Sequence, residues 1–418
     1  MKTLHEAFLK SPYRVHSLLF VIFIIAGFLY DSPIDVINGL RVIFTNADIL
    51  VTDYIYTAGF GAALVNSGLS GLLVVAALVI ARHEPVGLTM GTFGLTMGIG
   101  FFGKNPLNML PIILGGFLYA KFAGKHYREC VLRAVLATCL APAVTQVAFV
   151  SGLPMVVSIV VGIGVGLLIG FLINPVAIHD EPAHMGYNLY NVGFAAGFLG
   201  MAIFAFFSLI GASFYTLEYW SSGYDLQLII LLVAVSIYFI VCGVLSQGEK
   251  LSLRSLIFMH KNDNDYFRQF REKSYIHMGI LGFACLGLML VLRGEFNGPV
   301  IGAILSVIGF GAFGKALFSA APVVFGAILA ALASWAVVGA QFNQRGFLVA
   351  IFFSTCLSPF AKKYGVGWGI AAGFLHLSLA MNIGGFHGGM NLYNNGFAGG
   401  LSAMILLPIV MFFRREKV

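Results

Sequence analysis

Long apolar runs recur along the chain and are separated by short polar connections. A helix needs about 20 apolar residues to cross a bilayer, and most of the runs approach that length. They predict fourteen membrane-spanning helices, some of them short, at residues 17–30, 58–81, 86–103, 107–122, 130–149, 153–175, 188–213, 227–246, 276–292, 298–314, 317–338, 346–359, 366–383 and 391–413. The pattern therefore predicts an all-α integral membrane protein.

Two polar stretches interrupt this pattern. Residues 31–53 separate the first two runs and are predicted to lie along the membrane surface. Residues 246–274 form the longest hydrophilic insert, which is rich in Lys and Arg. This insert is predicted to be cytoplasmic. The first repeat is assigned to residues 1–225, and the second, which contains the insert, to residues 226–418.

A motif of fourteen residues occurs once in each half. The first copy, HMGYNLYNVGFAAG, runs from His184 to Gly197, and the second, HGGMNLYNNGFAGG, runs from His387 to Gly400. The copies are identical at ten of fourteen positions and lie 203 residues apart. A match of this length that includes His, Asn and Tyr does not follow from apolar composition alone. The chain is therefore predicted to be a duplication.

Two further pairs of segments support the duplication. A Phe-Gly-Lys segment ends at Lys104 and again at Lys315, and Thr-Cys-Leu-Ala-Pro142 matches Thr-Cys-Leu-Ser-Pro359. Equivalent residues are seven crossings apart if each predicted helix crosses once, so they lie on opposite sides of the membrane. The halves are therefore predicted to be inverted repeats of seven helices. The two prolines are predicted to break the fifth and twelfth helices.

The charge distribution predicts the orientation. The chain is 59% hydrophobic and 10% charged, whereas a soluble globular domain has about 25% charged residues. With a cytoplasmic N-terminus, twenty of the 24 Lys and Arg residues lie on the inner side, which places both termini in the cytoplasm. A twelve-helix alternative puts the basic insert outside and agrees less well. The net charge of +7 thus reflects topology, and no nucleic-acid partner is expected.

Each copy of the motif supplies candidate binding residues. Read as a helix, it places one His and two Asn on one face, and glycines with G-x-x-x-G spacing on the other. These side chains offer donors and acceptors without obligatory charge, and no apolar run holds Asp or Glu deep inside it. We expect them to bind a neutral or anionic solute, with interhelical hydrogen bonding as the alternative; they are His184, Asn188, Asn191, His387, Asn391 and Asn394.

Lys104 and Lys315 complete the candidate site. Each follows a glycine-rich run, so the pair could select an anion on the two sides of the membrane. The alternative is that both snorkel to the lipid headgroups. His277 and His376 have no matching His in the other half and are expected to be structural.

An inverted repeat favours transport by alternating access, because each half can adopt the conformation of the other. We expect a transporter for a small neutral or anionic polar metabolite, with a passive channel for an uncharged solute as the alternative. A membrane enzyme or scaffold is the third interpretation. No catalytic motif is present, and no cofactor or metal is expected. The five cysteines are expected to be packing residues. The expected partners are the lipid bilayer, the small-molecule substrate and, in a homodimer, a second copy of the chain.

The motif H-x-G-x-N-L-Y-N-x-G-F-A, in a Gly- and Phe-rich chain of this size, resembles a bacterial family of multi-pass membrane proteins known only as a domain of unknown function. That resemblance implies the bacterial cytoplasmic membrane and no particular substrate. The seven-plus-seven arrangement is similar to the uracil, sulfate and bicarbonate transporter superfamily, whose third and tenth spans carry half-helices around the substrate. The equivalent spans here are the glycine-rich runs that end at Lys104 and Lys315.

Overall fold

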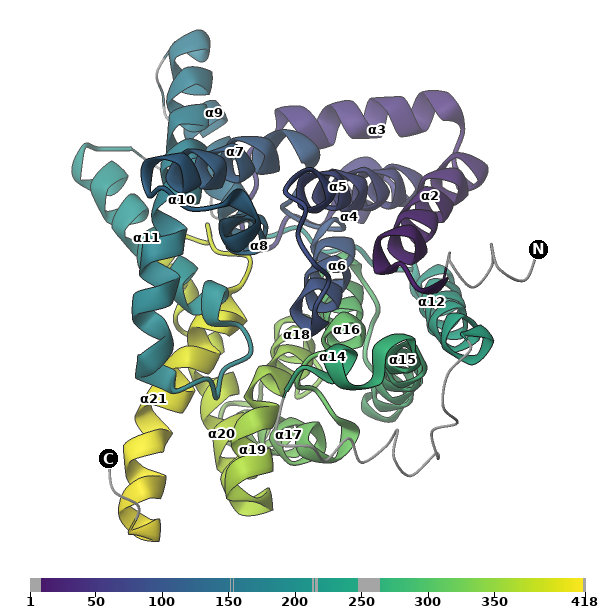
Figure 1. The fold of residues 1–418 in the computed structure, drawn as a ribbon, viewed down its shortest axis with the longest axis vertical. Helices are drawn as coiled ribbons and strands as arrows, with labels where there is room; N and C mark the ends of the chain where they lie inside the picture. The colour runs from purple at the N-terminus through teal and green to yellow at the C-terminus, as the bar shows by residue number, and fades with distance from the viewer. Residues whose placement is uncertain are drawn as a thin grey trace.

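The computed structural model describes residues 9–150, 152, 154–212, 214, 217–246 and 264–415. The described chain is helical, with three isolated β-bridges (Figure 1). The first half contains α2 (Pro12–Tyr30), α3 (Pro33–Thr45), α4 (Tyr54–Ala58), α5 (Phe60–Ile80), α6 (Gly87–Ile99), α7 (Pro106–Phe122), α8 (Tyr127–Ala137), η1 (Thr138–Leu140), α9 (Ala141–Val150), α10 (Met155–His184) and α11 (Asn191–Leu209). The second half contains α12 (Asp225–Leu245), α14 (Tyr266–Phe270), η2 (Arg271–Lys273), α15 (Ser274–Leu292), α16 (Gly298–Phe310), α17 (Leu317–Val338), α18 (Arg345–Ser354), η3 (Thr355–Leu357), α19 (Ser358–Tyr364), α20 (Val366–Ala380), η4 (Gly384–His387) and α21 (Asn394–Arg414).

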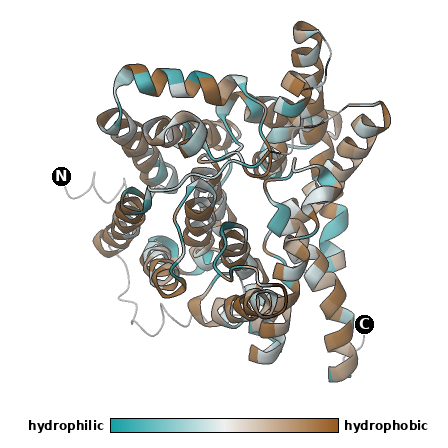
Figure 2. Cartoon of the chain, turned by 180° about the vertical axis from the view of Figure 1, so that it is seen from behind, coloured by the Kyte–Doolittle hydropathy of each residue, from teal (hydrophilic) through white to brown (hydrophobic). Residues whose placement is uncertain are grey.

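Each of the fourteen predicted apolar runs coincides with a helix or with a pair of consecutive helices. Within the described residues, nine helical segments are long and apolar enough to cross a membrane, and α7, α16 and α20 are shorter apolar helices. Apolar residues cover most helices, whereas hydrophilic residues gather on the connections and on parts of α3 (Figure 2). The architecture is that of a multi-pass membrane protein.

Equivalent helices pack against each other in the same way in both halves. The pairing of α2 with α5 recurs as α12 with α15, and the pairing of α7 with α10 recurs as α17 with α20. Gly170 on α10 lies against the carbonyl of Ile112, and Gly373 on α20 lies against the carbonyl of Val323. A Cβ at either glycine would overlap that carbonyl. The repeated sequence thus produces repeated packing.

The centre of the molecule is formed by α6 and α16, which lie side by side (Figure 1). Gly94 faces Gly309 and Gly98 faces Gly302, so the two helices run antiparallel. A Cβ built on Gly94 would lie 2.6 Å from the Cα of Gly309, which only glycine at this position allows. A helix of 13 residues is about 20 Å long, less than the hydrocarbon thickness of about 30 Å. The central pair is therefore made of short, fully surrounded helices.

Both central helices begin at a carboxylate from the other half. The backbone N–H of Gly298, at the start of α16, donates to Asp53 at 3.0 Å. The backbone N–H of Gly87, at the start of α6, donates to Asp265 at 2.9 Å. A negative charge at a helix N-terminus is favourable because it faces the positive end of the helix dipole. These reciprocal caps tie the two halves together.

The predicted breaks lie where the prolines indicated. A 3₁₀ turn, η1, interrupts the helix immediately before Ala141-Pro142, and η3 does the same before Ser358-Pro359. Most of the predicted central insert, residues 247–263, lies outside the described residues. Its end forms α14 and η2.

Candidate functional site

The two copies of the motif form loops, so the interpretation of each as one continuous helix is wrong. In the first copy α10 ends at His184, residues 185–190 form a loop, and α11 begins at Asn191. Gly186 has a φ of 76°, which a right-handed helix does not allow. The side chain of Asn188 also accepts a hydrogen bond from the backbone N–H two residues further on, an alternative to helical bonding.

The second copy breaks in the same way. There η4 ends at His387 and α21 begins at Asn394, with a loop between them. Gly388 and Gly389 have φ values of 55° and 71°. The break is thus a shared property of both copies, and it brings the polar residues to a loop between two helices.

A His–Asn pair closes each loop. The Nε2 of His184 donates to the Oδ1 of Asn191 at 2.9 Å, and the Nδ2 of Asn191 donates to a carbonyl of α10 at 2.9 Å. His387 and Asn394 repeat both bonds at 2.8 Å, the second to a carbonyl of α20. Each pair therefore connects the end of one helix with the start of the next.

The remaining asparagines connect the halves. The Nδ2 of Asn188 donates to the carbonyl of Gly396, and the Nδ2 of Asn391 donates to the carbonyl of Gly193. The next leucine in each copy donates its backbone N–H to the 3₁₀ turn of the opposite half. All six polar residues of the motif therefore hydrogen-bond to protein, as the alternative of interhelical bonding expects.

The two lysines lie in equivalent places but have different partners. Lys315 donates to the hydroxyl of Tyr190 at 2.5 Å and lies 4.7 Å from the centre of its ring and 5.2 Å from that of Phe310. Lys104 is also fully buried, yet among the described residues its Nζ has no hydrogen-bond partner, and the hydroxyl of Tyr393 has none either. Both side chains are buried within the protein, which does not fit snorkelling, because a snorkelling lysine keeps its ammonium group in water.

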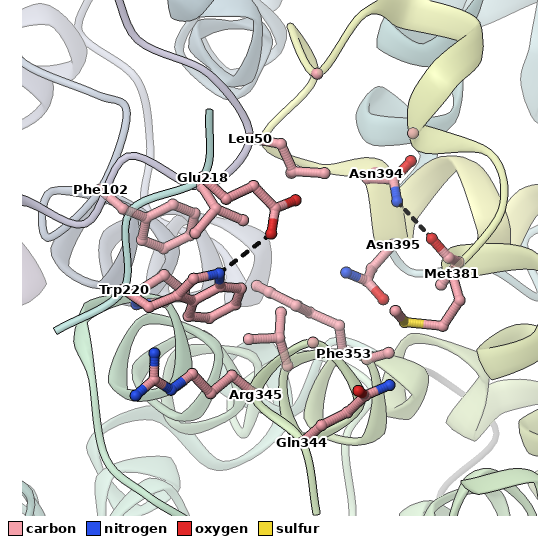
Figure 3. Close-up of a pocket in the computed structure, with 18 of the residues that line it drawn as sticks. Leu50, Phe102, Glu218, Trp220, Gln344, Arg345, Phe353, Met381, Asn394 and Asn395 are labelled. Carbon is pink, nitrogen blue, oxygen red and sulfur yellow. Dashed lines mark hydrogen bonds between the residues drawn. The ribbon is translucent and has the colours of Figure 1, made fainter. Parts of the chain in front are cut away.

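A cavity of about 920 Å³ opens between connections from both halves. Figure 3 shows aromatic, charged and carboxamide side chains around it. A largely apolar wall with a few polar groups is typical of small-molecule sites. Of the eight predicted site residues, Asn394 lines the cavity. The wall also includes Phe102, Phe204, Glu218, Trp220, Arg293, Glu295, Gln341, Asn343, Gln344, Arg345, Phe353 and Asn395.

Asn395 presents to this cavity a donor that bonds to none of the described residues. Its Oδ1 accepts a hydrogen bond from the Nε2 of His376 at 3.1 Å, and its Nδ2 points into the cavity (Figure 3). In the first half, the positions 203 residues earlier are Val192 and Ile173, so this polar pair belongs to the second half alone. The lack of a match led us to expect a structural role for His376. This difference between the halves is the better signal for a functional residue, because His376 and Asn395 replace apolar residues at two positions that contact each other.

Charged groups lie at the rim of the cavity. Arg345 and Glu295 form an ion pair at 2.8 Å, and their side chains are 34% and 36% exposed. Arg293 is exposed close by, and the Nε1 of Trp220 donates to Glu218 at 3.1 Å. Asn395 is 7% exposed and therefore belongs to the inner wall.

Two fully buried carboxylates lie in the stretch 31–53, which we expected along the membrane surface. Its first part, α3, is largely exposed, but Asp48 and Asp53 have no exposed surface. Asp53 accepts hydrogen bonds from Ile55, Ser221 and Gly298, and Asp48 from side chains of α4, α7 and α9. Residues 48, 49 and 51–53 are thus buried by other parts of the protein, and the location of this stretch along the membrane surface stays a prediction.

A family model of a protein of unknown function, DUF1576, matches residues 32–209 and 253–412, which together make up more than half of the chain. The chain belongs to this family. Each DUF1576 segment contains one copy of the motif, so the family match covers both halves. No curated protein and no solved structure matches the chain. The expected membership of a family of unknown function is confirmed in this form, and the likeness to the uracil, sulfate and bicarbonate transporters stays a prediction.

Proposed function

We propose that this protein is a membrane transporter that moves a small neutral or anionic polar metabolite by alternating access between two inverted repeats. The observation that carries the proposal is the cavity between the halves, with the Nδ2 donor of Asn395, which bonds to no other described residue, on its inner wall. A cavity of about 920 Å³ has room for a metabolite and its hydration water.

The recurrent packing supports an inverted repeat. The same glycine contacts occur in both halves, and the equivalent central helices α6 and α16 run antiparallel. A two-fold axis in the membrane plane reverses the direction of the helices that it relates, as this antiparallel pair requires. Two copies of one packing can exchange their conformations, which is the basis of alternating access.

The two halves differ in a way that supports an outward-open state of the proposed cycle. The connections that line the cavity are all on the predicted outer side, among them the segments around Leu50, Trp220 and Gln344. On the predicted inner side Lys315 is bonded to Tyr190, whereas Lys104 on the outer side lacks an equivalent bond. This is the arrangement expected of a transporter that is open to the outside and closed to the inside.

The polar groups favour a substrate with hydrogen-bond acceptors. The Nδ2 of Asn395 is a donor. The rim carries two guanidinium and two carboxylate groups: Arg345 is paired with Glu295, Glu218 accepts from Trp220, and Arg293 adds a further set of donors. A carboxylate or a neutral amide or hydroxyl compound would find donors here. The proposed substrate is thus a small polar metabolite without net positive charge.

Uptake into proteoliposomes tests this proposal. The purified protein is reconstituted and supplied with a panel of radiolabelled small carboxylates and neutral polar metabolites. We expect saturable uptake of at least one compound, a strong loss in Asn395→Ala, and normal uptake in Gln227→Ala, a change on α12 away from the cavity. Asn395→Asp adds a negative charge and is expected to exclude an anionic substrate more strongly than a neutral one. Flux that never saturates would indicate the passive channel, and uptake unchanged in both Asn395 variants would contradict the proposed site.

A further inference from the structure

Asp48 lies in the connecting segment between α3 and α4, outside the spanning helices, and is fully buried. Its Oδ1 accepts from the hydroxyl of Tyr54 at 2.9 Å. Its Oδ2 accepts from the Nδ2 of Asn108 at 3.1 Å and from the hydroxyl of Thr145 at 3.2 Å. These neutral donors come from α4, α7 and α9. Within the described part of the chain no cation bonds to this carboxylate, so a buried negative charge here has only dipoles to stabilise it.

The cage around Asp48 suits a protonated as well as an ionised carboxyl group. The Oγ1 of Thr145 lies 3.3 Å from the carbonyl of Pro142 and accepts from the backbone N–H of Asp48 at 3.1 Å. If Oδ2 gains a proton, it becomes a hydrogen-bond donor. The threonine hydroxyl can then rotate, so that its second lone pair accepts a hydrogen bond from Oδ2 and its own O–H donates to the proline carbonyl. No hydrogen bond is then lost between Asp48 and Thr145.

The cage around Asp53 is built from different donors, although burial raises the pKa of this carboxyl group as well. Three of its four hydrogen bonds come from backbone N–H groups, of Ile55, Ser221 and Gly298. A backbone N–H cannot turn into an acceptor, so these three bonds favour the ionised form, and the hydroxyl of Ser221 is the one donor that can reverse. Asp48 has two hydroxyl donors, Tyr54 and Thr145, and among the described residues no backbone N–H donor to its carboxylate, so the two carboxylates differ in how readily their donors reverse.

Asp48 is placed where its charge can act on the cavity. The three residues that follow it, 49–51, line the cavity. Asn108, which binds Asp48, also donates to the carbonyl of Gly103 at 3.4 Å, in the loop between Phe102 of the cavity wall and Lys104. Protonation of Asp48 thus changes a hydrogen-bond partner of the loop that carries both residues.

The threonine of this cage belongs to the first half alone. The second half has Lys362 and Lys363 where the first half has Thr145 and Gln146, counted from the matching prolines. Lysines are donors only and cannot form the reversible cage. A single site of this kind is what a coupling site requires, because one bound ion then biases one of the two states.

Burial raises the pKa of Asp48 from its ordinary value of 3.8 to about 7, while the hydrogen bonds from Tyr54, Thr145 and Asn108 act in the opposite direction. Among the described residues that pack against it, Tyr54 on α4 is the titratable group that faces it, and the side chains from α7 and α9 are neutral. A carboxyl group with this environment changes its charge close to physiological pH.

We propose that Asp48 reversibly binds a proton and that this proton couples to the opening of the cavity through Asn108 and the α6–α7 loop. The coupling rests on the proposed transport function, whereas proton binding does not. In the step itself a proton from water forms a bond to Oδ2, the carboxylate becomes neutral, and the reverse step returns the proton to water. A proton fits better than sodium because the donors around Asp48 turn their hydrogens toward the carboxylate, whereas a bound sodium needs oxygen lone pairs.

Infrared difference spectroscopy of the full-length protein in lipid tests proton binding. We expect a protonated carboxyl band that appears as the pH falls through about 7 and is absent in Asp48→Asn. Thr145→Val removes a hydrogen bond from both forms. Because a hydrogen bond to a charged group is roughly twice as strong as one to a neutral group, the ionised form loses more, and the midpoint should rise by about one pH unit. Thr145→Ser keeps the hydroxyl and is the matched control. If Asp48→Asn does not fold, the two Thr145 variants decide the question.

A band that persists in Asp48→Asn, or a midpoint that Thr145→Val leaves unchanged, would refute proton binding at this site. Repeating the titration in sodium chloride and in choline chloride separates the two cations. We expect equal midpoints, and a midpoint that sodium lowers would replace the proton by sodium as the bound ion.

Cavity accessibility tests the coupling without a substrate. A single cysteine is introduced by Gln344→Cys on the cavity wall, where background labelling is low because all five native cysteines are buried. The labelling rate is measured at each pH in two proteins that both carry Gln344→Cys, one with Asp48 and one with Asp48→Asn. The ratio of the two rates cancels the pH dependence of thiol reactivity, which both proteins share. We expect this ratio to change several-fold across the midpoint. A ratio independent of pH, beside a normal infrared titration, would refute the coupling and leave the proton site and the transporter proposal standing.

Discussion

Tyr190, which bonds to Lys315, and the equivalent Tyr393 allow a matched test of the difference between the halves. Tyr190→Phe removes the hydroxyl that accepts from Lys315, but it keeps the ring 4.7 Å from the Nζ. A hydrogen bond to a charged group contributes about 1.5–3 kcal/mol, and the cation–π contact that stays is worth about 0.5–2 kcal/mol. Because Lys315 is fully buried, no water replaces the lost acceptor. We therefore expect Tyr190→Phe to lower the free energy of unfolding by about 1.5–3 kcal/mol.

Tyr393→Phe is the control at the equivalent position of the other half. The hydroxyl of Tyr393 is buried and has no hydrogen-bond partner among the described residues, so its removal costs nothing or is slightly stabilising. The two variants remove the same atom from the same motif, and their unfolding equilibria should differ by at least about tenfold.

Reversible unfolding by sodium dodecyl sulfate, in mixed micelles, measures both free energies against the wild-type protein. Equal losses in the two variants would show that Tyr190 and Tyr393 have equivalent partners. That result would refute the inferred difference between the pairs and, with it, the assignment of an outward-open state. A loss confined to Tyr393→Phe would mean that the bonded pair is the outer one.

Two further predictions concern packing and the motif. Gly98→Val places a side chain against the backbone of Gly302, and we expect it to lower the free energy of unfolding by more than about 3 kcal/mol. Loss of monodisperse protein in size-exclusion chromatography would show this effect. Gly164→Ala meets open space and should behave as wild type. Asn394→Ala leaves the ring of His387 and a helix carbonyl without a partner and should lower the free energy of unfolding by about 1–3 kcal/mol, measured by the same detergent titration; an unchanged value would remove the structural role of this asparagine.

Hydrophobic pattern and repetition predicted much of the fold. The apolar runs predicted the helices, and the repeated Pro142 and Pro359 predicted the two breaks, because proline removes a helical hydrogen bond wherever it occurs. Repeated glycines indicated close packing, as Gly193 and Gly396 show where α11 meets α21. These properties depend on local chemistry and on comparison of one half with the other.

The site was predicted less well, because it depends on where connections lie. The stripe of His184, Asn188 and Asn191 assumed a helix that the positive φ of Gly186 interrupts. Asp48 was overlooked because a polar stretch between two spans ordinarily stays in water, and only the packing of α7 and α9 around it buries it. Such burial depends on contacts between residues about 60 and 97 positions apart, which no periodicity reveals.

The reciprocal caps have a consequence for biogenesis. The N–H at the start of α6 donates to an acceptor that is 178 residues further along the chain. Asp53 accepts from an N–H group that is 245 residues further along. While the ribosome is still making the second half, the N-terminus of α6 lacks the cap from Asp265, and Asp53 lacks the donor from Gly298. The first half on its own therefore cannot complete these caps. The central pair of α6 and α16 can assemble only after nearly three hundred residues have been inserted.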